Sequence, residues 1–162
     1  MLTPDQEKRV LSVLDIDVDD DDDGWYQHTK TRVRDCSPAE LHIIAAEWNW
    51  DNGWEALQAV AEHPNCDAAT ASLIFWGGRP DHILDDWMMA ADSEELDVEH
   101  RDLLLDIQDR YGRGAYQKTG ISFDPASRIQ ECTHSNVMPC MREKLYGLDL
   151  ASDIARIRKG LR

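Results

Sequence analysis

The sequence predicts an all-α fold: a single-domain antiparallel helical bundle, or a short helical-repeat-like stack, of about seven to eight helices with at most one short N-terminal strand. Apolar residues at helical spacing repeatedly follow helix-capping residues. No second convincing strand exists to pair with the one candidate strand. The length of 162 residues also suits one domain, because a domain usually holds roughly 100 to 200 residues.

Residues 1–35 are expected to form an N-terminal helix and an acidic loop, and residues 36–162 a helical domain. The first helix is predicted over Pro4 to Leu14. Thr3 and Gln6 fit a capping box before it, and proline suits its first position.

The segment after this helix is strongly acidic. Residues 15–23 hold seven aspartates, whose mutual repulsion favours a solvated loop. Trp25 to Arg34 follows Gly24 and is rich in Thr, Val and aromatic residues, so it is predicted as a short extended strand.

The next two helices are marked by turn and capping residues. Ser37, Pro38 and Glu40 combine an N-cap, a first-turn proline and a capping-box acid, and the apolar face that follows is Leu41, Ile44, Ala45 and Trp48. A second helix is expected between the turn Asn49 to Gly53 and the breaker His63-Pro64, with Trp54, Leu57, Val60 and Ala61 on its apolar face.

A central helix is predicted over Ala68 to Trp76, after the N-cap Asp67. It has almost no polar residue beyond Thr70 and Ser72, and a helix that is apolar all round must be surrounded by protein. Gly77-Gly78 is expected to end it.

Two further helices, Pro80 to Ala91 and Val98 to Tyr111, are expected to bury apolar residues and to expose aspartates. The exposed residues are Asp81, Asp85, Asp86, Asp102, Asp106 and Asp109. Three shorter helices are expected over Pro125 to Thr133, Pro139 to Tyr146 and Leu150 to Lys159, the last of them amphipathic and basic.

Charge is unevenly distributed along the chain. Thirty-two acids against 17 bases give −15, and residues 1–35, 36–115 and 116–162 carry −5, −13 and +3. Such a field repels nucleic acid and anionic membranes and attracts a basic protein partner.

No apolar run approaches the 18 residues of a membrane span, and Met1 to Leu14 lacks a signal-peptide pattern. The sequence therefore predicts a cytoplasmic protein. Its four cysteines are Cys36, Cys66, Cys132 and Cys140, and reduced, mostly buried thiols are expected.

The sequence offers two incomplete sets of metal ligands, and it predicts neither a metal nor a cofactor. The first ligand positions of an EF-hand loop match Asp19, Asp21 and Asp23, but Lys30 occupies the position that needs a bidentate glutamate. Cys132, His134 and Cys140 offer three zinc-type ligands, and a fourth would have to come from Cys36 or another histidine.

No catalytic residue is predicted, but one thiol is conceivable. Cys66 lies just before the presumed N-cap Asp67, where a helix N-terminus lowers a thiol pKa, and His63 is a conceivable base. Against this reading, Asp67 would raise the thiol pKa, and cysteine is often simply buried.

Trp50 lies in the Asn49 to Gly53 turn. A large ring there either anchors the turn or belongs to an exposed contact patch. The structural role is the favoured of the two.

Three motifs occur in order: Asn49-Trp50-Asp51-x-Gly53-Trp54, then His63-Pro64-Asn65-Cys66-Asp67, then Ala71 with Ile74-Phe75-Trp76. Together they resemble the bacterial family called domain of unknown function 4274, over roughly residues 40–115. The sequence departs from the family pattern at Asn52 and at Gly77-Gly78-Arg79-Pro80. The resemblance implies a bacterial helical domain without an assigned activity, so it supplies no catalytic residue.

The expected function is a non-enzymatic, acidic binding protein, most concretely an immunity protein that neutralises a basic bacterial toxin. Its candidate contacts are the six exposed aspartates named above and Trp50. The alternatives are a small cysteine-dependent enzyme using Cys66 and His63, and a structural or regulatory helical module that works through its own dimer.

Overall fold

The computed structural model describes residues 1–15, 25–80, 95–126 and 137–161. Within these ranges the chain forms seven α-helices and two short 3₁₀ helices, with no β-strand, so the all-α prediction is confirmed. The α-helices are α1 (Pro4–Leu14), α2 (Trp25–Val33), α3 (Pro38–Glu47), α4 (Glu55–Ala61), α5 (Ala68–Gly77), α7 (Glu95–Gly112) and α9 (Ala151–Gly160). The 3₁₀ helices are η1 (Trp50–Asn52) and η3 (Pro139–Arg142).

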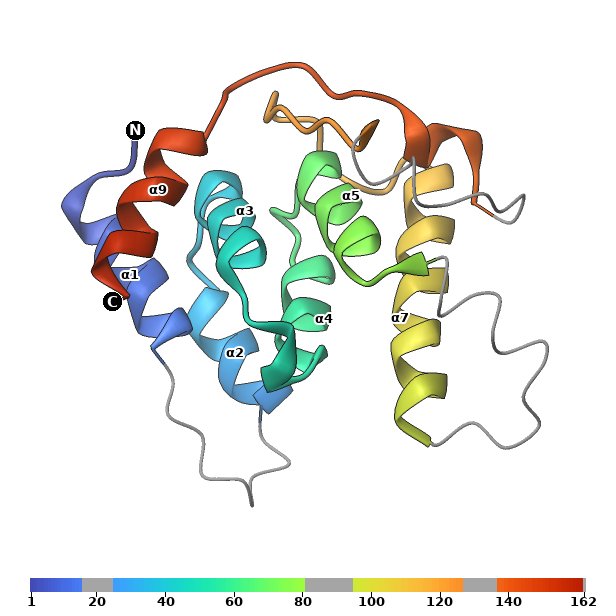
Figure 1. Ribbon diagram of the computed structural model, residues 1–162, viewed down its shortest axis with the longest axis horizontal. Helices are drawn as coiled ribbons and strands as arrows, with labels where there is room; N and C mark the ends of the chain where they lie inside the picture. The colour runs from blue at the N-terminus through green and yellow to red at the C-terminus, as the bar shows by residue number, and fades with distance from the viewer. Residues whose placement is uncertain (16–24, 81–94, 127–136, 162) are drawn as a thin grey trace.

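Helix α5 is the central element, as predicted. It packs against α3, α4 and α7 (Figure 1). Eight of its ten residues are buried, including the polar Thr70 and Ser72. Because α5 has no polar face, burial among three other helices is the arrangement that removes its apolar surface from water.

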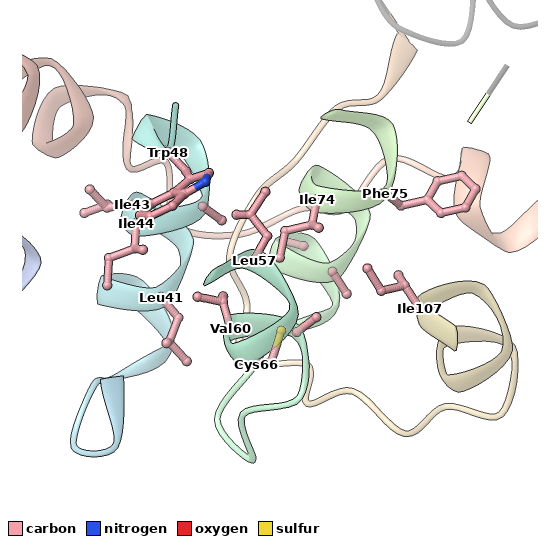
Figure 2. Packing of buried hydrophobic residues seen from close by; sticks show 14 of the residues in the cluster. Leu41, Ile43, Ile44, Trp48, Leu57, Val60, Cys66, Ile74, Phe75 and Ile107 are labelled. Carbon is pink, nitrogen blue, oxygen red and sulfur yellow. The ribbon is translucent and has the colours of Figure 1, made fainter. Parts of the chain in front are cut away.

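The core lies between α3, α4 and α5, and extends to α7. Figure 2 shows Leu41 of α3, Leu57 and Val60 of α4, and Ile74 of α5 within this region. All four side chains are at most 1% exposed. Burying a side chain of this kind contributes about 1.5–3 kcal/mol, so these contacts fix how α4 and α5 sit against α3.

Helices α1 and α9 bring the two ends of the chain together beside α3 (Figure 1). The Leu2 backbone N–H donates to Asp153 Oδ1 over 3.0 Å. Arg158 of α9 makes a bidentate ion pair with Glu47 of α3, at 2.6 and 2.9 Å. The basic C-terminal helix is thus engaged with the N-terminal half of the molecule.

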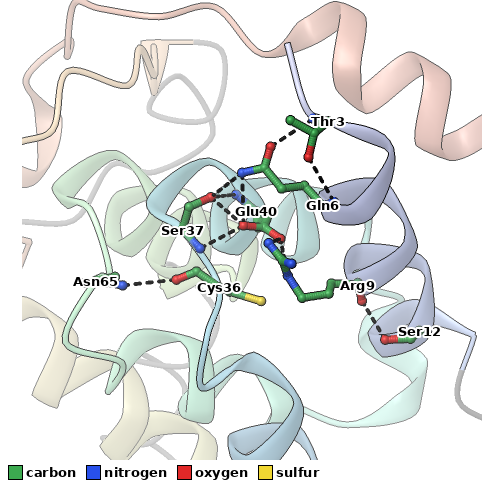
Figure 3. A network of polar contacts seen from close by, with 8 residues as sticks. All are labelled: Thr3, Gln6, Arg9, Ser12, Cys36, Ser37, Glu40 and Asn65. Carbon is green, nitrogen blue, oxygen red and sulfur yellow. Dashed lines mark hydrogen bonds and ion pairs between the residues drawn. The ribbon is translucent and has the colours of Figure 1, made fainter.

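A buried carboxylate joins α1 to α3 (Figure 3). Glu40 is fully buried and closes a capping box with Ser37, and Arg9 of α1 reaches it at 2.8 and 2.9 Å. Burial opposes ionisation of Glu40, but hydrogen bonds from Arg9 and Ser37 outweigh it and lower the pKa of its carboxyl. The charge is therefore retained at neutral pH.

The predicted strand over Trp25 to Arg34 is wrong, because residues 25–33 form helix α2. Thr29 and Val33 are fully buried and lie four residues apart, on one face of that helix. This face packs against α1 and α4. Tertiary contacts have overridden the strand preference of the β-branched and aromatic residues.

The prediction of a helix over Pro139 to Tyr146 is also wrong in its length. Only the short η3 forms, and Leu145 then pairs with Phe123 in an isolated antiparallel bridge. The last helix begins at Ala151 and ends at Gly160, close to its predicted bounds. The predicted helices over Pro80 to Ala91 and Pro125 to Thr133 lie almost entirely outside the described residues.

None of the helices in the described ranges has both the length and the apolar content needed to span a membrane.

Candidate functional site

The candidate site is a groove of about 410 Å³ between α4 and α7. Both helices also pack against α5 (Figure 1). We call this feature the acidic groove, because four of its seven lining residues are carboxylates and none is a lysine or an arginine. The lining residues are Trp54, Gln58, Glu62, Glu99, Asp102, Leu103 and Asp106.

Helical periodicity places these residues in the groove. Leu103, Leu104 and Ile107 of α7 are buried. Glu99, Asp102 and Asp106 follow the i, i+3, i+7 spacing that keeps side chains on one helix face. On the other wall, Trp54, Gln58 and Glu62 recur every four residues. Each wall therefore follows from the same periodicity that buries the neighbouring apolar residues.

Glu62 is held in a fixed position on the α4 wall. Gln58 Nε2 donates to Glu62 Oε1 over 2.9 Å, and the Tyr26 hydroxyl donates to Glu62 Oε2. Lys30 Nζ in turn donates to the Tyr26 hydroxyl over 3.0 Å. Helix α2, where sequence reasoning expected a strand, thus supplies the support for one of the groove carboxylates.

The carboxylates on the α7 wall are only partly neutralised. Asp102 Oδ1 accepts from Arg101 at 2.9 and 3.2 Å, and Asp106 Oδ2 accepts from Arg110 at 3.4 Å. The other oxygen of each aspartate has no hydrogen-bond donor in the described part of the chain, and neither does Glu99. Both aspartates are exposed to solvent, which screens such ion pairs and limits each to about 0–1 kcal/mol, so the wall can accept further donors.

Trp54 forms part of the apolar lining together with Leu103. Its ring is partly buried, and the indole nitrogen itself is buried with no hydrogen-bond acceptor among the described residues. An indole N–H without an acceptor is costly to bury.

The structure brings together two of the seven predicted contact residues. Asp102 and Asp106 line the groove, whereas the exposed Asp109 pairs with Arg113 outside it. Asp81, Asp85 and Asp86 lie outside the described residues.

Four lining residues were missed by sequence reasoning: Trp54, Gln58, Glu62 and Glu99. The four-residue spacing of Trp54, Gln58 and Glu62 is the signal in the sequence, but the periodicity of the predicted helix also places Trp54 on its apolar face.

Trp50 packs inside the domain rather than in the groove. Its ring lies 5.6 Å from that of His100 on α7, centroid to centroid. A Cβ atom added to Gly77 would lie 2.9 Å from the Trp50 ring. Trp50 therefore joins the end of α5 to α7. This is a structural role, not that of a residue in an exposed contact patch.

The geometry gives no support to thiol chemistry at Cys66. The side chain is 1% exposed and lies among core residues (Figure 2), and burial, with the charge of Asp67, raises the pKa of its thiol to about 12. Both ring nitrogens of His63 are engaged: Nδ1 with the Asn65 N–H at 3.0 Å, and Nε2 with the Arg34 carbonyl at 3.2 Å. Neither nitrogen is placed to take a proton from the thiol.

The described ranges contain no group of three or more His, Cys, Asp or Glu side chains that could hold a metal ion. Cys36 is buried, and burial raises the pKa of its thiol to about 11. Cys132, His134 and the aspartates Asp19, Asp21 and Asp23 lie outside the described residues.

Comparison with known families identifies the central part of the chain. The model of a family described as Domain of unknown function (DUF4274) matches residues 36–112. This segment belongs to the DUF4274 family. It contains α3, η1, α4, α5 and α7, so both walls of the acidic groove are built from the DUF4274 segment. No curated protein matches the chain, and no solved structure matches it.

The motifs that carry the DUF4274 resemblance hold turns and helix ends. In the first, the Gly53 carbonyl accepts from Nε1 of Trp48, the residue before the motif, over 2.8 Å, and Asn49 Oδ1 accepts from the Asp51 N–H. Gly53 has a φ of 89°, a conformation that favours glycine. These contacts close the turn between α3 and α4.

In the second motif, Asp67 caps α5 and anchors a distant segment. Its Oδ1 accepts from the Ala69 N–H at 2.7 Å, and its Oδ2 accepts from the hydroxyl and the backbone N–H of Thr119. Asn65 Nδ2 donates to the Cys36 carbonyl over 3.1 Å. These motif residues therefore act as structural anchors, and the groove residues other than Trp54 lie outside the motifs.

Proposed function

We propose that this protein is a non-enzymatic binding protein that holds a basic protein partner in the acidic groove. The observation that carries the proposal is the lining itself, in which four carboxylates face a space of about 410 Å³ that no lysine or arginine lines. Its most specific form is an immunity protein that acts in the cytoplasm and neutralises a basic bacterial toxin.

Electrostatics supports this proposal. A cleft lined by charges of one sign focuses the field and attracts oppositely charged partners. Residues 36–115 carry 17 acids and 4 bases, so the field around the groove has the same sign as its lining. Complementary charge raises association rates and selects basic over acidic partners.

The groove also offers contacts beyond charge. Trp54 and Leu103 provide apolar surface, and an aromatic ring attracts a cation placed over its face. Tryptophan is enriched among the residues that dominate binding energy at interfaces. A basic side chain can therefore bury its aliphatic stem while its charge meets the carboxylates.

Co-purification from the native host with groove variants tests the proposal. The groove variant combines Glu99→Gln, Asp102→Asn and Asp106→Asn. The matched control combines Asp5→Asn, Asp35→Asn and Glu143→Gln, three exposed carboxylates outside the groove. Both variants change the net charge by the same amount.

We expect the wild type and the control to retain the same basic protein at low salt, and the groove variant to lose it. Expression of that partner alone should impair growth, and co-expression of this chain should relieve the effect. A partner retained equally by all three proteins, or the absence of any basic partner, would contradict the proposal.

A further inference from the structure

We propose that His63 is a pH-sensitive latch. While its imidazole is neutral, it ties the junction between α2 and α3 to the turn between α4 and α5, and it releases that junction when the imidazole gains a proton. His63 does not line the acidic groove, so the latch is independent of the proposed function. The hydrogen bonds of the ring, and the chemistry of the groups that make them, carry this inference.

The partners of the His63 ring fix its protonation state. Nδ1 lies 3.0 Å from the backbone nitrogen of Asn65, whose N–H can only donate, so Nδ1 must be the acceptor. Nε2 lies 3.2 Å from the carbonyl oxygen of Arg34, which can only accept, so Nε2 must carry the proton. Both contacts are satisfied only by the neutral imidazole with its proton on Nε2.

A proton added to Nδ1 of His63 turns that nitrogen from an acceptor into a donor. The imidazolium N–H and the Asn65 N–H then face each other as two donors, and the hydrogen bond within the turn is lost. The ring has to move to separate them. The bond from Nε2 to the Arg34 carbonyl, 29 residues away in sequence, depends on the same ring position. Closure of the latch and protonation of the ring therefore exclude each other.

The contacts that do not involve His63 make the release local. Asn65 Nδ2 donates to the Cys36 carbonyl over 3.1 Å (Figure 3), and neither an amide nor a carbonyl changes its protonation near neutral pH. The Tyr26 hydroxyl of α2 donates to Glu62 at the end of α4, and the two helices pack against each other. Opening of the latch therefore frees the Asn65 amide and the Arg34 carbonyl while α2 stays packed on α4.

His63 is placed to respond to pH. It is only partly buried, so protons reach it from solvent. Histidine ordinarily changes its charge between about pH 5 and pH 8, whereas carboxylates do so near pH 4 and tyrosine and lysine near pH 10. The titratable groups on the elements packed around the turn and the junction are Tyr26, His28, Lys30 and Arg32 of α2, Arg34, Asp35 and Cys36 at the junction, Glu55 and Glu62 at α4, Cys66 and Asp67 in the turn, and Arg113, Tyr116 and Lys118 after α7.

These neighbours leave His63 as the group at the latch that titrates in this range. Burial raises the pKa of the Cys36 thiol to about 11 and that of the Cys66 thiol to about 12. Arg34 and Asp35 have exposed side chains that pair with each other at 4.0 Å. The other histidine in the set, His28, is exposed on α2, so it provides a control for titration outside the latch.

The chain itself shows which substitution keeps the contact without the titration. Asn49 Oδ1 accepts from the backbone N–H of Asp51, two residues further on, over 3.2 Å. His63 and Asn65 have the same spacing, and asparagine commonly makes this turn. His63→Asn therefore retains an acceptor for the Asn65 N–H and cannot be protonated. His63→Ala removes both the acceptor and the titration.

Hydrogen exchange followed by NMR tests the latch. The protection factor of the Asn65 amide, which corrects for the intrinsic pH dependence of exchange, is measured at about pH 7.5 and about pH 5. The proteins are the wild type, His63→Asn, His63→Ala and the control His28→Asn, all checked for cooperative thermal unfolding at both pH values. The ¹⁵N chemical shifts of the His63 ring at the higher pH report its tautomer.

We expect the Asn65 protection factor of the wild type and of His28→Asn to fall by about tenfold on acidification, the factor that one hydrogen bond of ordinary strength contributes. At the lower pH the wild type should match His63→Ala, which lacks this protection at both pH values. His63→Asn should keep its protection unchanged between the two pH values. The wild-type ring should carry its proton on Nε2 at the higher pH.

Three results would overturn the latch. The first is an Asn65 protection factor that is the same at both pH values in the wild type. The second is a loss of protection in His63→Asn equal to that of the wild type, which would assign the response to another titrating group. The third is a neutral His63 ring with its proton on Nδ1, which could not accept from Asn65.

Discussion

His42 is a buried histidine that the fold keeps neutral. It lies on α3, is 5% exposed, and its Nδ1 is 3.1 Å from the Thr70 hydroxyl on α5. Burial lowers the pKa of His42 to about 4, although the nearby charge of Asp67 opposes the shift. The contact joins α3 to the central helix α5.

This lowered pKa predicts a specific loss of stability in acid. Below about pH 6.5 the unfolded chain binds a proton at His42, and the folded chain does so only near pH 4. The free energy of unfolding therefore falls as the pH decreases through this window, by about 3 kcal/mol from this residue. Urea denaturation at several pH values measures the effect.

His42→Gln provides the comparison, since glutamine stays neutral and can still contact Thr70. The variant should lose less stability than the wild type between pH 6.5 and pH 4. Parallel stability curves for the two proteins would show that His42 does not titrate as stated.

At the scale of elements, Asp67 links the start of α5 to the segment that follows α7. One oxygen caps the helix and the other accepts from Thr119, while Gln117 pairs with Asp67 itself in an isolated parallel bridge. An N-cap contributes about 0.5–2 kcal/mol. The second oxygen adds an anchor between residues 52 positions apart in sequence.

Two substitutions separate these contributions. Asp67→Asn keeps a capping oxygen but loses the acceptor for Thr119, so it should cost about 1 kcal/mol. Asp67→Ala loses both functions and should cost about 3 kcal/mol. Urea denaturation provides the values, and equal costs for the two variants would show that the Thr119 anchor contributes nothing.

The end of α5 is packed tightly against Trp50, and Gly77 is the residue at this contact. A Cβ at Gly77 would lie 2.9 Å from the Trp50 ring, whereas a Cβ at Gly160 on α9 would lie 3.6 Å from the nearest atom, on Leu11. Gly77→Ala should therefore destabilise the protein by about 1–3 kcal/mol through overpacking.

Gly160→Ala is the matched control, because it also replaces a glycine in the last turn of a helix. It should be neutral or stabilising, since alanine is the better helix former. Thermal unfolding compares the two variants. A Gly77→Ala protein as stable as the wild type would mean that Trp50 moves aside without cost.

The protein carries a large net negative charge, −15 in formal terms. Its ion pairs neutralise individual carboxylates but leave this net charge in place. On α7, three exposed aspartates pair with arginines, two of which are partly buried. Arg158 with Glu47 joins α9 to α3. Repulsion among many like charges destabilises a compact state. It weakens with salt, since the Debye length falls from about 30 Å at 0.01 M to about 10 Å at 0.1 M.

We therefore expect the midpoint of thermal unfolding to rise by several degrees between 0.01 and 0.3 M NaCl, a roughly 30-fold range of ionic strength. Calorimetry at fixed pH measures this change. A midpoint that falls with salt would show that the ion pairs outweigh the net repulsion.

Local signals in the sequence predicted most helices correctly. The capping boxes at Thr3 and Ser37 and the N-cap at Asp67 form as predicted, because each is made by residues within one helical turn. The strand predicted at Trp25 to Arg34 is wrong for the opposite reason. The burial of Thr29 and Val33 against α1 and α4 depends on residues far along the chain.

The residues of the acidic groove also divide into those that local sequence signals predict and those that depend on tertiary contacts. Helical periodicity identified Asp102 and Asp106 as exposed acids, and they line the groove. It could not show that Trp54 and Glu62, the residues at the two ends of α4, would face them, since α4 and α7 are separated in sequence by the whole of α5.

The sequence by itself determined the all-α class, the central position of α5 and the excess of negative charge, because composition and short-range periodicity set these properties. Only the tertiary structure decided which carboxylates share a groove, that Trp50 is a packing residue and that Cys66 is enclosed. These features depend on how distant helices approach one another, and that approach is fixed by the packing of many side chains at once.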